Sequence, residues 1–508
     1  MEDKESNELA SGNYSIEVKD FGPIVRANVD LRPLTVFIGP SNTGKSYLAI
    51  LIYALHQFFG EADAPFYWHR FRFRRRRLAR PAMRSLQPSA STQESLTNWL
   101  TSMLEKNAAP SLPQDVASLL RPILERPEVE GQLEAEIRRC FGVEDHNDLV
   151  RQPGNHPIAK VGLTIPQATR SQAVRYAFEF GQSGSHFSGE IPILESMTIG
   201  QEIPEELLFV ARRLMMMDES SADDELESVW LSLAHTLFQS LTHPLIRNAF
   251  YLPADRTGVM HSHQVVVSTL IQNATTAGLR PSADVPMLSG VLADFLNELI
   301  LLSERHLPKS SVKLAEMLEG KILKGAVKLN RTDTGYPAFT YRPNGWKVDL
   351  PLMRTSSMVS ELAPVVLYLR HLVHPGNLLI IEEPESHLHP AMQAAFAREL
   401  ARLVRAGVRV ILTTHSEWFL EQLGNLVRLG MLPEEKRKST VDPGYALRPD
   451  EIGAWLFEPK QRPRGSVVRE VTLDMETGLF PTDFDPVSEA LYNEGAEIFN
   501  RMQEGAGE

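Results

Sequence analysis

This sequence contains few cysteines, no long apolar run and no excess of positive charge. The 508 residues include a single cysteine, Cys140, which excludes an intramolecular disulfide and a cysteine-based zinc cluster. No segment approaches the roughly 18 consecutive apolar residues that a membrane-spanning helix needs. The first 15 residues are acidic and polar and contain no apolar signal region. We therefore expect a cytoplasmic protein with no membrane association.

Charge and composition also limit the class of protein. The formal net charge of -12 excludes a basic surface over the whole molecule, so any contact with nucleic acid must come from a local patch. Hydrophobic residues make up 43% of the chain and charged residues 23%, which is typical of soluble globular proteins. The length is sufficient for two or three domains.

The stretch from Leu34 to Leu55 has the pattern of a strand, a glycine loop and a helix. Its centre fits the spacing G-x-x-x-x-G-K-[ST], in which backbone N–H groups and the helix N-terminus hold a phosphate. Lys45 would reach the β- and γ-phosphates, and the hydroxyl of Ser46 would bind Mg²⁺. The predicted nucleotide-binding residues are Gly39, Pro40, Ser41, Asn42, Thr43, Gly44, Lys45 and Ser46.

A second motif follows a continuous apolar run at 378–381, which is typical of a strand buried on both faces. The run ends in Glu382 and Glu383. In phosphate-loop ATPases the first acid supports Mg²⁺ and the second can polarise the attacking water. The first position is usually Asp, so the longer Glu382 leaves its metal geometry open. The predicted catalytic residues are Glu383, Lys45 and, in the next motif, His415.

A third motif, "VRVILTTHS", predicts another buried strand that ends at His415. A histidine at the carboxyl end of such a strand faces the crevice where α/β sheets bind ligands. We expect His415 to sense the γ-phosphate. Downstream of the paired glutamates the sequence alternates Glu385, His387 and His389. This alternation could form a metal site, but we expect an ordinary loop that binds no metal.

Together, "GPSNTGKS", "LLIIEEPESHLHP" and "ILTTHS" resemble the ATPase head shared by ABC, SMC and OLD-type proteins. "EEPESHLHP" and "YLPADRTG" are similar to compact bacterial AAA-labelled ATPases found beside nucleases in phage-defence and genome-maintenance loci. The resemblance implies ATP and Mg²⁺ as cofactors. It also implies an α/β fold, an ABC-type P-loop ATPase head with a mixed central sheet and flanking helices. It covers about 13–58, 248–258 and 345–422.

Such heads hydrolyse ATP between two subunits, so the resemblance implies a homodimer or a higher oligomer formed through the heads. One subunit supplies a signature serine to the γ-phosphate of the other, and Ser356 lies at the expected place. The usual glycine is replaced by Met358, so Ser356 is either a degenerate signature or only a helix N-cap. Arg256 is an active-site candidate by resemblance, with a structural ion pair as the alternative.

Patterns outside the motifs predict the organisation of the chain. Apolar residues at three- and four-residue spacing predict a large α-helical insertion at 61–247. Alternating runs near 320–352 predict an antiparallel meander. The full division is head at 1–60, helical insertion at 61–247, head strand at 248–260, second helical insertion at 261–319, C-terminal head lobe at 320–480, and terminal helix or tail at 481–508.

One basic segment, 66–84, contains eight arginines and no acid. Arginines bind phosphates and interleaved aromatic residues stack on bases, which makes DNA or RNA a possible partner. Docking on an acidic protein surface is the alternative. The candidate residues are Arg70, Arg72, Arg74, Arg75, Arg76 and Arg77.

The resemblance leads us to expect an ATPase that uses ATP to change conformation in antiviral defence or DNA surveillance, with a nuclease or toxin as partner effector. The alternative is a nucleotide-switched scaffold with negligible hydrolysis that assembles or restrains such an effector. Glu382 and the missing signature glycine favour the alternative. The nucleotide subunit of an ABC transporter fits poorly because of the large insertion.

Overall fold

The fold is taken from a computed structural model of the whole chain. It describes residues 12–60, 88–106, 111–125, 130–151, 158–167, 173–182, 184–192, 230, 233–234, 236–263, 265–266, 288–302, 309–331, 337–437, 442–473, 478–479, 490 and 493–496. The predicted arginine segment at 66–84 lies outside these residues, as does most of the predicted C-terminal tail.

The described strands form one 11-stranded sheet and one 3-stranded sheet. Half of the large sheet is parallel, in the order β13-β3-β12-β11-β7. The bounds of these strands are β3 (Leu34–Ile38), β7 (Ala249–Leu252), β11 (Leu378–Glu382), β12 (Arg409–Thr414) and β13 (Ile452–Gln461).

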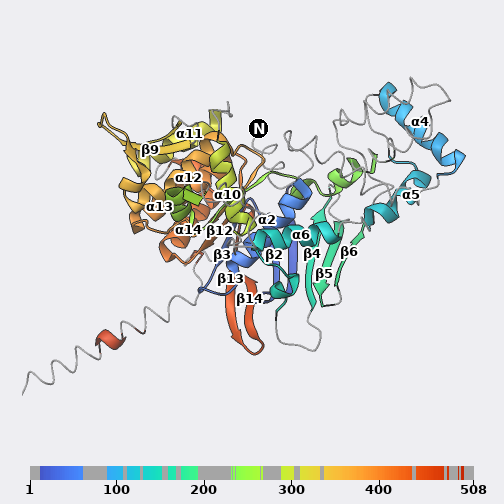
Figure 1. The fold of residues 1–508 in the computed structure, drawn as a ribbon, viewed down its shortest axis with the longest axis horizontal. Coiled ribbons are helices and arrows are strands. Elements are labelled where there is room, and N and C mark those ends of the chain that lie inside the picture. Colours follow the sequence, from blue (N-terminus) through green and yellow to red (C-terminus); the bar gives the residue numbers. More distant parts are fainter. Residues whose placement is uncertain are drawn as a thin grey trace, which may run out of the picture.

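Strands β3, β11 and β12 and the first six residues of β13 are buried and mostly apolar because both faces of this half of the sheet are covered. In β3, Val36 packs into one core and Phe37 into the other. Helix α2 (Lys45–Gly60) covers one face. Apolar residues on the other face pack in one core with α10 (Gly290–Leu301), α11 (Lys309–Leu318), α12 (Ser357–His371), α13 (Pro390–Arg405) and α14 (Glu417–Met431) (Figure 1). A short helix, α15 (Glu434–Arg437), follows α14.

The other half of the large sheet runs β6-β5-β4-β1-β2-β14. All its neighbours are antiparallel except β2 and β14, which are parallel. The bounds are β1 (Tyr14–Phe21), β2 (Ile24–Leu31), β4 (Ile158–Pro166), β5 (Ala173–Gly181), β6 (Gly184–Glu190) and β14 (Arg464–Glu470). One face packs with α2 and with α4 (Ala90–Lys106), α5 (Gln114–Glu125) and α6 (Glu130–Phe141).

The small sheet confirms the predicted meander. Its order is β10-β9-β8, with bounds β8 (Gly325–Arg331), β9 (Pro337–Pro343) and β10 (Leu350–Pro351). The chain then passes through a short 3-10 turn into α12. The meander thereby places Ser356 at the start of α12, in the C-terminal lobe.

The prediction that 61–247 is a helical insertion is wrong for 158–190. Those residues form β4, β5 and β6, which extend the central sheet beyond β1. The reason lies in their two-residue alternation, as in Ile158–Pro166, where every second side chain is buried. Helices α4, α5 and α6 in the same insertion are as expected. In the described part of the chain, no helix combines the length and apolar character needed to cross a membrane.

Candidate functional site

The phosphate loop connects β3 to α2 at the carboxyl edge of the parallel strands. Its backbone needs residues that tolerate positive φ: Gly39 has φ +136°, Asn42 +63° and Gly44 +100°. A Cβ on Gly44 would lie 2.7 Å from Cγ1 of Ile24, and a Cβ on Gly39 would lie 2.7 Å from the carbonyl oxygen of Phe457. Glycine is therefore required at both positions by conformation and by space.

Lys45, the first residue of α2, is buried with its ammonium turned into the loop. Its Nζ donates hydrogen bonds to the carbonyl oxygens of Gly39 at 2.8 Å and Pro40 at 2.7 Å. Burial lowers the pKa of Lys45 to about 8, opposed by the charges of Glu383, Glu385 and Glu382. Three carboxylates from the second motif therefore lie close enough to act on this ammonium. The two predicted motifs meet at one edge of the sheet.

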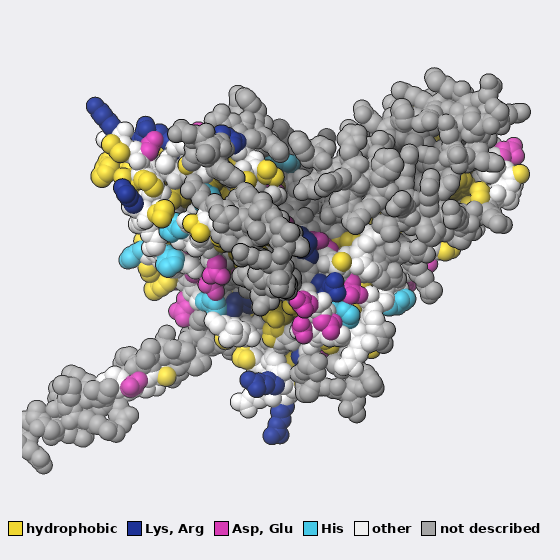
Figure 2. Space-filling view, in the orientation of Figure 1, with side chains coloured by type: hydrophobic (Ala, Val, Ile, Leu, Met, Phe, Trp, Pro, Cys, Tyr) yellow, Lys and Arg dark blue, Asp and Glu magenta, His cyan; other side chains and the backbone are white. Residues whose placement is uncertain are grey.

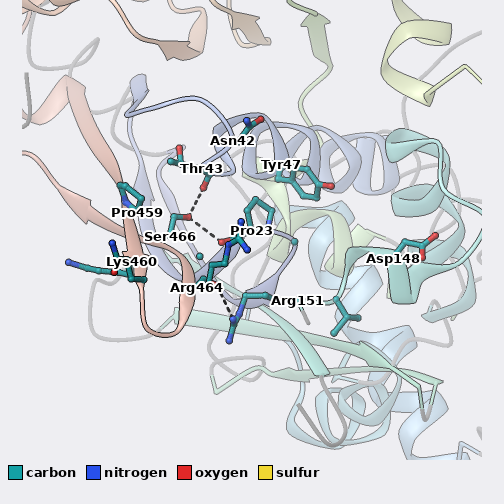
Figure 3. Close-up of a pocket in the computed structure, with 14 residues that line it drawn as sticks. Pro23, Asn42, Thr43, Tyr47, Asp148, Arg151, Pro459, Lys460, Arg464 and Ser466 are labelled. Atoms are coloured by element: carbon teal, nitrogen blue, oxygen red, sulfur yellow. Dashed lines mark hydrogen bonds between the residues drawn. The ribbon is translucent and has the colours of Figure 1, made fainter. Parts of the chain in front are cut away.

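A pocket of about 740 Å³ opens beside the loop (Figure 3). Asn42 and Thr43 of the loop, Tyr47 of α2 and the β13–β14 hairpin line it. Ser466 of the hairpin is almost fully buried, and its hydroxyl donates to the carbonyl oxygen of Thr43 at 2.5 Å. The volume suits a nucleoside next to a bound phosphate. The sequence motifs did not point to Ser466, which lies 423 residues from its partner.

Glu382 ends β11, which is separated by β12 from β3, the strand that leads into the loop. It is buried, and its Oε2 accepts a hydrogen bond from the backbone N–H of Ala254 at 3.1 Å. Its Oε1 is buried with no hydrogen-bond partner in the described part of the chain. Ser46, in the first turn of α2, is exposed, so its hydroxyl is accessible. A free carboxylate oxygen and a free hydroxyl are ligands that suit Mg²⁺, so these residues fit the predicted metal.

Glu383 and His415 form a pair at the same edge. His415 Nε2 lies 3.1 Å from Glu383 Oε1, with side-chain exposures of 33% and 40%. This hydrogen bond lowers the pKa of Glu383 below its usual range, against the effect of burial, so the carboxylate is ionised near neutral pH. The backbone of Glu383 has φ +41°, in the left-handed region that costs free energy for a side-chain-bearing residue.

Glu385 does not take part in a metal site with His387 and His389. No group of three potential metal-binding side chains occurs among the described residues. Instead, Glu385 Oε1 accepts from the hydroxyl of Thr414 at 2.7 Å and from the backbone N–H of His415 at 2.6 Å. Burial raises its pKa. Glu385 therefore fixes the end of β12, which carries His415.

Arg256 is fully buried and ion-pairs with Glu361 of α12. Its guanidinium also donates to the carbonyl oxygens of Pro253 at 3.0 Å, Glu382 at 2.6 Å and Glu383 at 3.1 Å. In this arrangement the guanidinium exposes no surface to solvent, and all of these contacts are made within the chain. The alternative, a structural ion pair, is what the structure shows.

Ser356 is the N-cap of α12 and is exposed. Its side chain accepts from the backbone N–H of Val359 at 3.4 Å, so capping by itself accounts for this serine in one subunit. Its exposure leaves the hydroxyl and the helix N-terminus accessible to another molecule. Met358, in place of the usual glycine, is partly buried and packs against the core beneath α12.

The strand order gives the decisive geometric observation. The ends of β3, β12 and β11 are in register, with Ile38 opposite Thr414 and Glu382 opposite Thr413. The loop, the paired glutamates and the histidine therefore converge on one edge of a parallel sheet. Residues 213–420 match the family model for the AAA ATPase domain. This part of the chain is therefore similar to AAA ATPase domains, and the phosphate loop and the strand register fit a P-loop ATPase.

The family match covers about two fifths of the chain and includes the paired glutamates and His415. The structure is similar to three solved structures of SMC heads. One is described as the SmcHead bound to the C-winged helix domain of ScpA (11% identity, TM-score 0.39), covering 91% of this chain and 98% of that chain. The second is the SMC head domain from Thermotoga maritima (12%, 0.35), covering 91% and 99%.

The third is the Pyrococcus furiosus Smc head with an extended coiled coil, bound to the C-terminal domain of ScpA. The sequence identity is 10% and the TM-score is 0.37, and the alignment covers 95% of this chain and 98% of that chain. These likenesses are weak, so the assignment rests on the loop, the strand register and the family match. No curated protein matches this sequence.

Proposed function

We propose that this protein binds and hydrolyses ATP between two heads and converts dimerisation into a conformational change. The observation that supports it most is the pair of Glu383 and His415 beside the phosphate loop. A buried ammonium, an ionised carboxylate and a histidine next to an anion-binding loop are the groups that phosphoryl transfer to water needs.

Lys45 and the loop amides hold the triphosphate. The Lys45 ammonium donates to the loop carbonyls of Gly39 and Pro40, which holds it inside the loop where the phosphates would bind. Ser46 and Glu382 would hold Mg²⁺, which neutralises phosphate charge when bound. The pocket beside Tyr47 receives the nucleoside.

Glu383 acts as the general base. Its ionised carboxylate accepts a proton from water as the water oxygen attacks the γ-phosphorus and the bond to the β-phosphate oxygen breaks. His415 holds this carboxylate through Nε2 and is near enough to donate to the γ-phosphate once the nucleotide is in place. Glu385 fixes the backbone at His415 and thereby the position of the pair.

The site is completed by a second subunit. The exposed N-terminus of α12, with Ser356, offers a hydroxyl and free backbone N–H groups to the γ-phosphate bound by a partner head. The heads would therefore close in a head-to-tail dimer. A role in antiviral defence or DNA surveillance with a nuclease or toxin effector is supported by the resemblance of "EEPESHLHP" and "YLPADRTG" to ATPases of such loci.

A nucleotide-switched scaffold is the second candidate. Met358 stands where a glycine would let the partner phosphate approach closely, and Glu382 is one methylene longer than Asp. Both changes favour slow or negligible hydrolysis. In that case ATP binding, rather than turnover, would control the effector.

Phosphate release by Glu383→Gln separates the two candidates. Loss of a general base typically costs about 10²- to 10⁴-fold in rate, so the variant should release almost no phosphate yet accumulate as a dimer with Mg·ATP on size exclusion. The matched control is Glu421→Gln, an exposed acid on α14, which should stay within about twofold of wild type. Equal, near-zero release by wild type and Glu383→Gln would support the scaffold.

A further inference from the structure

The antiparallel half of the large sheet has one face that no described helix covers. In β1 the side chains of Tyr14, Ile16 and Val18 are buried against α2 and its neighbours, while those of Ser15, Glu17 and Lys19 are partly exposed on the other side. The same alternation continues in β2 and β4. The uncovered face is therefore polar and accessible across at least three strands.

Cations lie directly opposite one another on this face. Lys19 of β1 is paired in register with Arg26 of β2 on one side and with Lys160 of β4 on the other. Residues directly opposite on antiparallel strands share a face and approach within about 5.5 Å, so like charges there are destabilising. A row of three cations across three adjacent strands is therefore a cost to the fold that a bound anion would remove.

The row is accessible and only partly neutralised. The side chains of Lys19, Arg26 and Lys160 are 45%, 64% and 51% exposed. Glu17 lies 3.0 Å from Lys19 and 3.6 Å from Arg26, so two of the cations share one carboxylate. Glu179 pairs with Lys160 at 2.7 Å.

The β13–β14 hairpin adds further cations beside this row. Val467 of β14 is in register with Arg26, which brings the hairpin against the row. Residues 459–469 contain four cations and no acid. Lys460 and Arg469 share Glu458, whereas Arg462 and Arg464 are exposed and pair with no carboxylate in the described part of the chain. Figure 2 shows Lys and Arg side chains gathered where this hairpin projects in Figure 1.

We propose that this surface, the cation row, binds the phosphate backbone of a double-stranded nucleic acid. Among the described residues its seven cations pair with three carboxylates, Glu17, Glu179 and Glu458, in a chain whose net charge is -12. A local excess of positive charge on an acidic protein is the electrostatic footprint of polyanion binding. The cations are Lys19, Arg26, Lys160, Lys460, Arg462, Arg464 and Arg469.

The face favours a duplex over a single strand. Binding of single strands relies on aromatic side chains on which bases stack. The outward positions of β1, β2 and β4 between and beside the cations are Ser15, Glu17, Asn28, Asp30, Gly162 and Thr164, and none is aromatic. Recognition would therefore be of the backbone and independent of sequence.

The test is fluorescence anisotropy of a labelled duplex of about 30 base pairs, titrated with full-length protein without nucleotide at several salt concentrations. The row variant is Lys19→Gln/Arg26→Gln/Lys160→Gln, which touches neither the phosphate loop nor its pocket. The control variant, Lys313→Gln/Lys324→Gln/Lys347→Gln, removes the same charge from exposed lysines of the other lobe. The row variant should lose at least tenfold in affinity. The magnitude of its slope of log K against log salt concentration should fall by about 2 to 3. The affinity of the control variant should stay within twofold of that of wild type.

The proposal would be overturned if wild type did not bind the duplex at about 50 mM salt, or if both variants lost the same affinity for it. It would also be overturned if polyglutamate competed more strongly than unlabelled duplex of equal charge. That result would indicate an acidic protein as the partner. Folding of the row variant is checked by its thermal midpoint, which should change little, because the ion pairs lost with Glu17 and Glu179 are exposed and contribute little to stability. ATP affinity should be unchanged in the row variant, so failure here is distinguishable from failure of the ATPase proposal.

Discussion

Replacing Arg256 by Met tests whether one buried guanidinium holds the catalytic edge together. Arg256 is 0% exposed and its partner Glu361 is 1% exposed. Removing one member of a buried ion pair costs about 3–5 kcal/mol, because the remaining carboxylate would be buried with only the hydroxyl of Thr257 as a hydrogen-bond partner. For a unit of 150–250 residues each kcal/mol lowers the thermal midpoint by about 2–4 °C, so we expect a fall of about 6 to 20 °C.

A double variant distinguishes the loss of stability caused by an unpaired charge from the loss caused by altered packing. Arg256→Met/Glu361→Leu removes both charges and should recover at least half of the lost stability, because buried pairs replaced by apolar residues are often neutral. Arg256→Lys keeps the charge but cannot reach the carbonyl oxygens of Pro253, Glu382 and Glu383 together, so it should lie between wild type and Arg256→Met. Differential scanning calorimetry measures all four proteins.

The reasoning would be refuted by a midpoint for Arg256→Met within about 2 °C of wild type. It would also be refuted if the double variant were no more stable than the single one. ATP turnover should fall in Arg256→Lys even at temperatures where it is fully folded, since the guanidinium fixes the carbonyl of the predicted base, Glu383. Unchanged turnover would limit Arg256 to a role in stability.

The remaining predictions concern the phosphate loop. Because burial lowers the pKa of Lys45 to about 8, free protein loses this charge above pH 8, whereas bound phosphates would restore it. ATP binding should therefore take up about 0.9 proton at pH 9 and almost none at pH 7, with about tenfold weaker affinity at pH 9. Calorimetry in two buffers measures the uptake, Lys45→Met should show none, and equal affinity at both pH values would contradict the argument. Gly44→Ala should cost about 2 to 5 kcal/mol, from strain at φ +100° and from the 2.7 Å approach of its Cβ to Ile24. The control Gly320→Ala meets no atom within 4 Å and should shift the thermal midpoint by no more than about 2 °C.

The sequence predicted those parts of the fold in which an apolar buried strand is followed directly by a motif with known chemistry. Leu34–Ile38 and Leu378–Glu382 are apolar because they are buried on both faces, and each is followed by a motif with a narrow range of roles. The register that brings their ends together follows from the parallel sheet. The presence and order of the loop, the glutamates and the histidine could therefore be foreseen.

The errors have equally specific causes. Residues 158–166 and 173–181 alternate clearly, but they stand among amphipathic helices, and the whole segment was assigned as helical. The strand Ile452–Gln461 begins with six buried residues and was missed because no motif marks it. The partner of Arg256 lies 105 residues away, so no local pattern chooses between an active-site contact and a structural ion pair. The cation row depends on the register between β1, β2 and β4, which the sequence does not display.

The two halves of the sheet meet at the phosphate loop. Ser466 of β14 hydrogen-bonds the carbonyl oxygen of Thr43, and Ile24 of β2 packs where a side chain at Gly44 would stand. Both strands belong to the half that carries the cation row, and Arg26 is two residues from Ile24. A shift of the loop on binding nucleotide would therefore act on β2 and β14 through these two contacts. Because coupling between two binding sites is reciprocal, a polyanion on the row would change ATP affinity by the same factor by which ATP changes binding of the polyanion. If the proposed function and the cation row are both correct, these contacts would link the nucleotide to the polyanion without a coiled-coil arm.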